Sequence, residues 1–182
     1  MKRAMKFTQL LFCCFLLTLP ISVRAESGNG VNASDSVKAF VQRFYDWYVP
    51  KALNSRSESA WSTAFKTKGR CFSPELRRKL REDSEVQAKV EGEIVGLDFD
   101  PFLNSQDPGG RYSVGKVVLK GENYFVDVHR VVAGKPEAKL TATAEVTGKN
   151  GQWYFLNFIY PGGHNLLGIL KALKDDRDKP VQ

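Results

Sequence analysis

The sequence predicts an α+β fold, with N-terminal helices packed on a four-stranded antiparallel sheet and a short helix at the C-terminus. Two observations predict it. Apolar residues recur at helical spacing in the first half of the chain, and from Arg111 onward they alternate with polar residues as in half-buried strands. The connections between these strands are short, so neighbouring strands must run antiparallel.

Residues 1–25 have the composition of a signal peptide. Three basic residues precede an apolar run from Phe7 to Leu19, and Val23 and Ala25 are small residues placed like a cleavage signal. We expect cleavage after Ala25 and a periplasmic or secreted protein, with an uncleaved signal anchor as the alternative. The apolar run is shorter than the roughly 20 residues that span a bilayer, so we expect no stable membrane span in the mature chain.

Removal of this segment changes the charge and the cysteine count. The full chain has a net charge of +7, but the segment carries four basic and no acidic residues, which leaves 23 basic against 20 acidic residues. A net charge of +3 argues against nucleic acid as a partner. Cys13 and Cys14 leave as well, so Cys71 has no internal disulfide partner. We expect Cys71 to be a small buried apolar residue, with an intermolecular bridge or a reactive thiol as alternatives.

The mature chain is predicted to hold one domain over 34–174. Residues 26–33 are rich in Gly, Ser and Asn and predict a flexible start, and residues 175–182 predict a solvated tail. The first helix begins with Ser34 or Asp35 as its cap, and Pro50 is expected to end or kink it.

Two features are expected between the first helix and the sheet. Residues 54–69 are polar and predict a loop with one helical turn, pinned by Trp61 and Phe65. A second helix begins with Ser73 as its N-cap and a proline at the first helical position, and runs to about Val90. Its basic run at 77–81 looks like an anion site, but the interleaved acidic residues favour a solvated helix face.

The second half predicts a meander of strands. Residues 133–136 form a turn, and the last and most apolar strand is expected to be central. A final helix begins after Asn165 and reaches about Leu173. The four strands are expected over 112–120, 124–132, 140–146 and 152–160.

One candidate site is the acidic segment that contains Asp98, Asp100, Gln106 and Asp107. Carboxylates at this density suit calcium, but the glycine and glutamate of an EF-hand loop are missing, and we assign no metal. A structural explanation accounts for more of the pattern: Asp100 caps a short turn that begins with Pro101. A ligand or partner surface is the alternative.

A second candidate pair lies on a predicted strand. Asp127 and His129 are two residues apart, so they share a face and could act as an acid–base pair. The other face of this strand is more apolar, and a solvated pair is the simpler expectation. The sequence contains no Cys/His metal cluster, phosphate-binding loop, dinucleotide motif or nucleophile elbow, so we assign no catalytic residue and no cofactor.

Several of these residues carry a family resemblance. Asp98-Phe99-Asp100-Pro101 with Gln106-Asp107, the Gly151-Gln152-Trp153 strand start and the bend before Asn165-Leu166 resemble secreted bacterial proteins of the YbjP/YqhG type, a family of unknown function. The resemblance covers about residues 37–174. It implies a cone of the nuclear-transport-factor-2-like (cystatin-like) kind, with helices against a strongly curved sheet, and a periplasmic location, but no chemistry.

The leading functional prediction is an exported, non-catalytic binding protein for an unknown small molecule or envelope protein. Its candidate ligand or partner surface comprises Asp98, Asp100, Gln106, Asp107, Asp127 and His129. One alternative is an inhibitor or immunity-type protein that caps an envelope enzyme or toxin, and another is a small enzyme that uses a pocket Asp with His129 or a neighbouring Tyr. Homodimerisation through the open, apolar face of the sheet is a further alternative.

Overall fold

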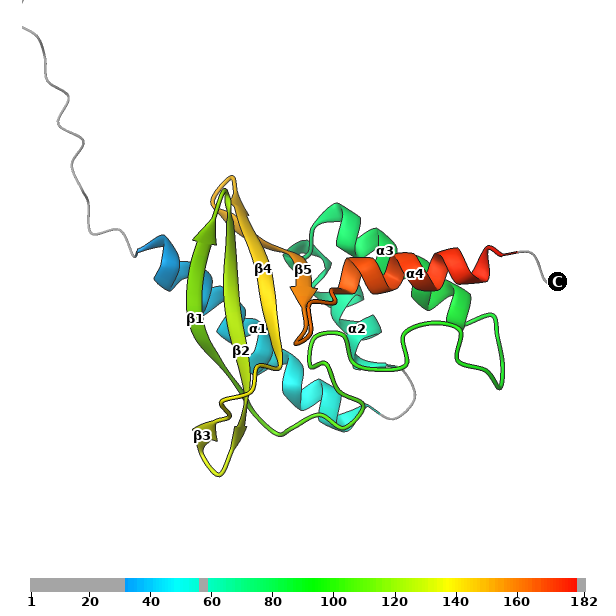
Figure 1. Ribbon diagram of the computed structural model, residues 1–182, viewed down its shortest axis with the longest axis horizontal. Helices are drawn as coiled ribbons and strands as arrows, with labels where there is room; N and C mark the ends of the chain where they lie inside the picture. Colours follow the sequence, from blue (N-terminus) through cyan, green and yellow to red (C-terminus); the bar gives the residue numbers. More distant parts are fainter. Residues whose placement is uncertain (1–31, 56–58, 180–182) are drawn as a thin grey trace, which may run out of the picture. The chain divides into compact units, whose positions relative to one another are not determined.

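The computed structural model describes residues 32–55 and 59–179, so the predicted signal peptide and residues 26–31 of the predicted flexible start lie outside the described residues. Within them the fold is α+β, as predicted (Figure 1). The helices are α1 (Ala33–Asn54), α2 (Ala60–Thr67), α3 (Pro74–Gln87) and α4 (Leu166–Arg177), with the short 3-10 helix η1 (Gly69–Cys71) before α3. The strands are β1 (Tyr112–Lys120), β2 (Asn123–Val132), β3 (Lys135–Pro136), β4 (Ala142–Lys149) and β5 (Gln152–Ile159).

The four predicted strands form an antiparallel sheet in the order β1-β2-β4-β5. Val126 of β2 lies opposite Ala144 of β4, and both side chains are fully buried on the helix-covered face. The predicted turn at 133–136 contains one more strand than expected, because Lys135 and Pro136 pair with the end of β2.

The prediction that the most apolar strand is central is wrong, because β5 lies at the end of the strand order. Its outer edge is covered by the segment that leads into α3, where Phe72 pairs with Phe155 and the Ser73 N–H donates to the Phe155 carbonyl at 2.9 Å. The Phe155 ring packs against Phe40 and Phe44 of α1, each at 4.8 Å between ring centroids. Burial beneath a helix therefore explains the composition of β5.

The ends of α1 differ from the prediction. Asn32 caps the helix in place of Ser34 or Asp35, and its side-chain oxygen accepts from the Ser34 N–H. The helix does not end at Pro50 but continues to Asn54, whose side-chain amide donates to the Pro50 carbonyl. A proline removes only one intrahelical donor, so a last turn with its own side-chain bond persists beyond it.

Residues 60–67 form more helix than predicted. Trp61 and Phe65 are buried and anchor α2, as expected for these two rings, but the helix spans eight residues instead of one turn. The start of α3 is as predicted, since the Ser73 hydroxyl accepts from the Leu76 N–H at 3.2 Å. Packing of α2 beside α3 creates the cleft described below.

The predicted tail begins later than residue 175, because α4 continues to Arg177. Arg177 donates to Asp83 at 2.7 Å and to the Val95 carbonyl at 2.8 Å, while the second carboxylate oxygen of Asp83 accepts from the Leu97 N–H. The Asp83 side chain is only 1% exposed, so it is a buried tether between α3 and α4. Among the described helices, none combines the length and apolar composition needed to cross a membrane.

Candidate functional site

Three of the predicted site residues meet at one cleft. Asp98, Asp100 and Gln106 line a space of about 530 Å³ beside α2, with Trp61 and Phe99 as apolar walls. The Gln106 side-chain amide donates to the Asp98 backbone carbonyl at 3.0 Å. The structure therefore brings part of the acidic segment together at one cleft.

Asp100 caps the turn that follows it, as expected. One carboxylate oxygen accepts from the N–H groups of Phe102 and Leu103 at 3.0 and 3.1 Å, and the other accepts from the Tyr48 hydroxyl. Burial raises the pKa of Asp100 to about 6, although these hydrogen bonds oppose the rise. Both oxygens have partners within the chain, which assigns Asp100 to holding the turn. Asp107, later in the same segment, is exposed and does not line the cleft.

Asp127 and His129 lie on one face of β2 but have separate partners. Asp127 accepts from the Thr143 hydroxyl at 3.0 Å, and His129 Nδ1 lies 2.8 Å from the Glu137 carbonyl oxygen. The His129 ring covers Gly115, where an added Cβ would lie 2.9 Å from Nε2. Among the described hydrogen bonds none joins Asp127 to His129, and neither residue lines the cleft beside Asp98. The structure does not unite the two candidate sites.

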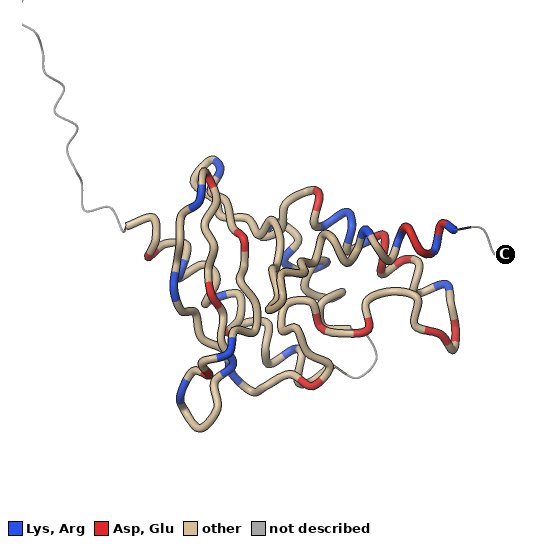
Figure 2. The backbone as a smooth tube through the Cα atoms, viewed as in Figure 1, with Lys and Arg blue, Asp and Glu red and all other residues tan. Residues whose placement is uncertain are grey.

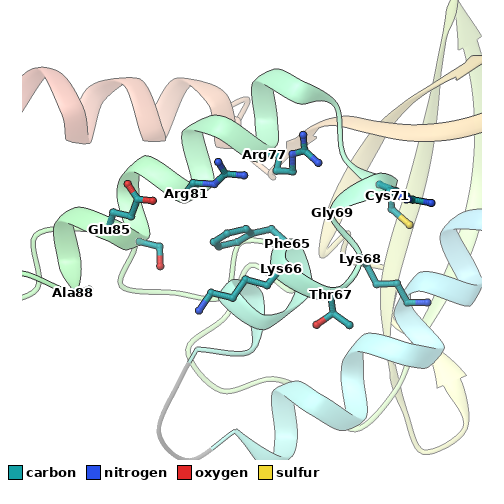
Figure 3. Close-up of a pocket in the computed structure, with 12 residues that line it drawn as sticks. Phe65, Lys66, Thr67, Lys68, Gly69, Cys71, Arg77, Arg81, Glu85 and Ala88 are labelled. Carbon is teal, nitrogen blue, oxygen red and sulfur yellow. The ribbon is translucent and has the colours of Figure 1, made fainter.

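A second cleft, of about 750 Å³, lies between α2, η1 and α3 (Figure 3). We name it the basic groove, because five cationic side chains and one carboxylate line it. These are Lys66, Lys68, Arg70, Arg77, Arg81 and Glu85, and the remaining lining residues are Phe65, Thr67, Gly69, Cys71, Ser84 and Ala88.

The basic side chains at 77–81 of α3 lie on two sides of the helix. Arg78 pairs with Glu82 at 2.5 Å on the solvent side of the helix, as predicted for a solvated face. Arg77 and Arg81 line the basic groove across from Phe65 of α2 (Figure 3). Within the described part of the chain, no ion pair involves Arg77 or Arg81. Arg81 is exposed and Arg77 is half-buried, so both stay open to solvent as predicted, but the packing of α2 and η1 beside them places them at the border of a groove.

The residues of η1 set the shape of the groove at its other wall. Gly69 lets Arg77 approach closely, since an added Cβ would lie only 3.3 Å from Arg77 Cδ. Cys71 is half-buried and unbridged, and burial raises the pKa of its thiol while Lys68 opposes the rise. A protonated thiol is a poor nucleophile. The Lys68 ammonium lies 5.2 Å from the centre of the Trp47 ring, toward α1.

This arrangement suits an oxygen anion. A guanidinium group presents parallel N–H donors that match two oxygens of a carboxylate or phosphate, and a cleft lined mainly by cations concentrates a positive electrostatic field. Among the described residues, no group of three or more His, Cys, Asp or Glu is placed to hold a metal ion. The sequence does contain a signal, in the alternating Lys66, Lys68 and Arg70 and in the one-turn spacing of Arg77 and Arg81, but only the helix packing joins the two sets.

Comparisons with protein-family models, curated proteins and solved structures give no match. The resemblance to YbjP/YqhG-type proteins therefore stays a prediction, and the functional argument depends on the groove itself.

Proposed function

We propose that the protein is a non-catalytic binding protein and that its ligand is an anion held in the basic groove. The observation that carries the proposal is the pair Arg77 and Arg81, which face the groove with no ion-pair partner among the described residues. Like charges one helical turn apart destabilise a helix by a few tenths of a kcal/mol. A ligand carboxylate, phosphate or sulfate would supply the missing partner.

The size and the composition of the groove support the same function. Its volume of about 750 Å³ lies within the rough 300–1,000 Å³ range of ligand sites. Phe65 provides an apolar floor, and the hydroxyls of Thr67 and Ser84 add neutral hydrogen-bonding groups. The enzyme alternative that pairs Asp127 with His129 is not favoured, because both residues lie outside the groove and no described hydrogen bond joins them. In the cleft beside α2, both carboxylate oxygens of Asp100 already accept hydrogen bonds from within the chain, which favours a structural role for that carboxylate.

We infer that this binding takes place outside the cytoplasm, on the evidence of the composition of residues 1–25. On this inference the partner is a small molecule or an envelope protein, and the weak charge expected of the mature chain argues against nucleic acid. Fractionation of cells that express the full chain tests the export step, and retention of residues 1–25 on a cytosolic protein would contradict it.

Removal of the arginine charges tests the site. We expect Arg77→Gln/Arg81→Gln to bind pyrophosphate at least about tenfold more weakly than the unmodified chain, since each charge-assisted hydrogen bond contributes about 1.5–3 kcal/mol. Isothermal titration calorimetry at low salt measures the affinity. Arg43→Gln/Arg78→Gln is the matched control, because it removes the same charge from exposed positions outside the groove. Equal binding by both double variants, or no binding of pyrophosphate, citrate or sulfate by the unmodified chain, would contradict the proposal.

A further inference from the structure

The charge of the basic groove changes sign along α3. In the sequence of α3, basic residues at 77–81 precede the acidic residues Glu82, Asp83 and Glu85. Figure 2 marks the basic and acidic residues along the backbone. Of these acidic residues only Glu85 lines the groove, because Asp83 is buried with Arg177 and Glu82 pairs outside. The groove therefore offers two cations followed by one anion along its α3 wall.

The spacing of these three charges is regular. Arg77, Arg81 and Glu85 are four residues apart in succession and form one ridge of the helix, with a rise of about 6 Å between neighbours. In an extended peptide, side chains on one face recur at every second residue, about 6.6 Å apart. Three alternate side chains of an extended peptide laid along α3 would meet the three groove residues one to one.

The position of Glu85 selects among anionic ligands. A polymer with a negative charge on every repeat would place a charge against Glu85, which repels it. A peptide can change the sign of its side chains at the third position. Arg81 and Glu85 are exposed and Arg77 is half-buried, and none of them has an ion-pair partner among the described residues, so all three are accessible to such a partner.

We propose that the basic groove binds an extended segment of a partner protein with the pattern acidic–x–acidic–x–basic, read in either chain direction. This inference rests on the proposed function, because it names the ligand of the same groove. The two acidic side chains pair with Arg77 and Arg81, and the basic side chain pairs with Glu85. The intervening residues face solvent or the Phe65 side of the groove.

Synthetic peptides test the pattern by fluorescence anisotropy. The probe peptides are end-blocked and fluorescein-labelled, with the sequences Glu-x-Glu-x-Lys and Lys-x-Glu-x-Glu, in which x is Ser or Thr. The control Glu-x-Lys-x-Glu has the same composition and charge but places lysine against Arg81 and glutamate against Glu85. We expect at least one probe peptide to bind about tenfold more tightly than the control, as two mismatched charges are removed.

A charge reversal in the protein gives an independent readout. Glu85→Lys changes an exposed side chain, and we expect it to weaken binding of the preferred probe peptide and to strengthen binding of Glu-x-Glu-x-Glu. Two results would overturn the peptide pattern. One is equal affinity of the unmodified chain for the probe peptides and the control peptide, and the other is tighter binding of polyphosphate than of either probe peptide. If pyrophosphate binding still depends on Arg77 and Arg81, only this inference fails. If the unmodified chain binds neither peptides nor pyrophosphate, the proposed function fails with it.

Discussion

Three tyrosine hydroxyls and one carboxylate hold the turn that begins at Asp100. Tyr45 and Tyr160 donate to the carbonyls of the two residues that follow Asp100, each at 2.8 Å, and Tyr48 donates to the carboxylate. A buried hydroxyl without a partner costs about 1–3 kcal/mol, so these bonds favour one conformation of the turn. At the scale of residues, the acidic segment therefore serves the fold first.

The raised pKa of Asp100 predicts a pH dependence of stability. The folded-state pKa of about 6 lies above the ordinary value of 3.8, so between these values the folded protein binds the extra proton and its free energy of unfolding falls as pH rises. Asp100→Asn removes this titration while keeping the size of the side chain. We expect the stability of the variant relative to the unmodified chain to rise by roughly 1–3 kcal/mol from about pH 4 to pH 7 in urea unfolding. A difference that stays constant with pH, or falls, would contradict the assignment.

At the scale of elements, local patterns were sufficient for some starts but not for all, since the cap of α1 is Asn32 and not one of the two predicted residues. The Ser73 cap and the alternation along β4 were both read correctly from neighbouring residues. The extension of α4 to Arg177 could not be, because its partner Asp83 is far away in the sequence. The central position assigned to β5 failed for the same reason, since a helix and not a neighbouring strand covers it.

The tether between α3 and α4 predicts that one substitution in the last turn of α4 lowers the free energy of unfolding strongly. Arg177→Gln leaves the buried Asp83 carboxylate without its cation, and we expect a loss of about 2–4 kcal/mol in the free energy of unfolding. The double variant Asp83→Asn/Arg177→Gln should recover part of this loss, because no charge remains buried. Lys171→Gln, which breaks an exposed pair with Asp175 on the same helix, is the control and should change stability little. Equal effects of Arg177→Gln and Lys171→Gln in denaturant unfolding would contradict the tether.

At the scale of the whole molecule, the fold class could be predicted from the sequence and the basic groove could not. The α+β class followed from periodicity and short connections, which are local properties. The basic groove did not follow, because its walls come from residues 65–71 and 77–88, and only the formation of α2 sets them beside each other. A charged helix face and a binding groove have the same sequence pattern until the facing helix is known.

A single titration followed over the whole chain tests the central claim that the basic groove is the anion site. Backbone amide shifts of isotopically labelled protein are measured by NMR as pyrophosphate is added. We predict the largest shifts at Lys66–Cys71 and around Arg77 and Arg81, with β2 and its Asp127 and His129 unaffected. Shifts that concentrate on β2 or on the cleft of Asp98, or that spread evenly over all exposed lysines, would contradict the account.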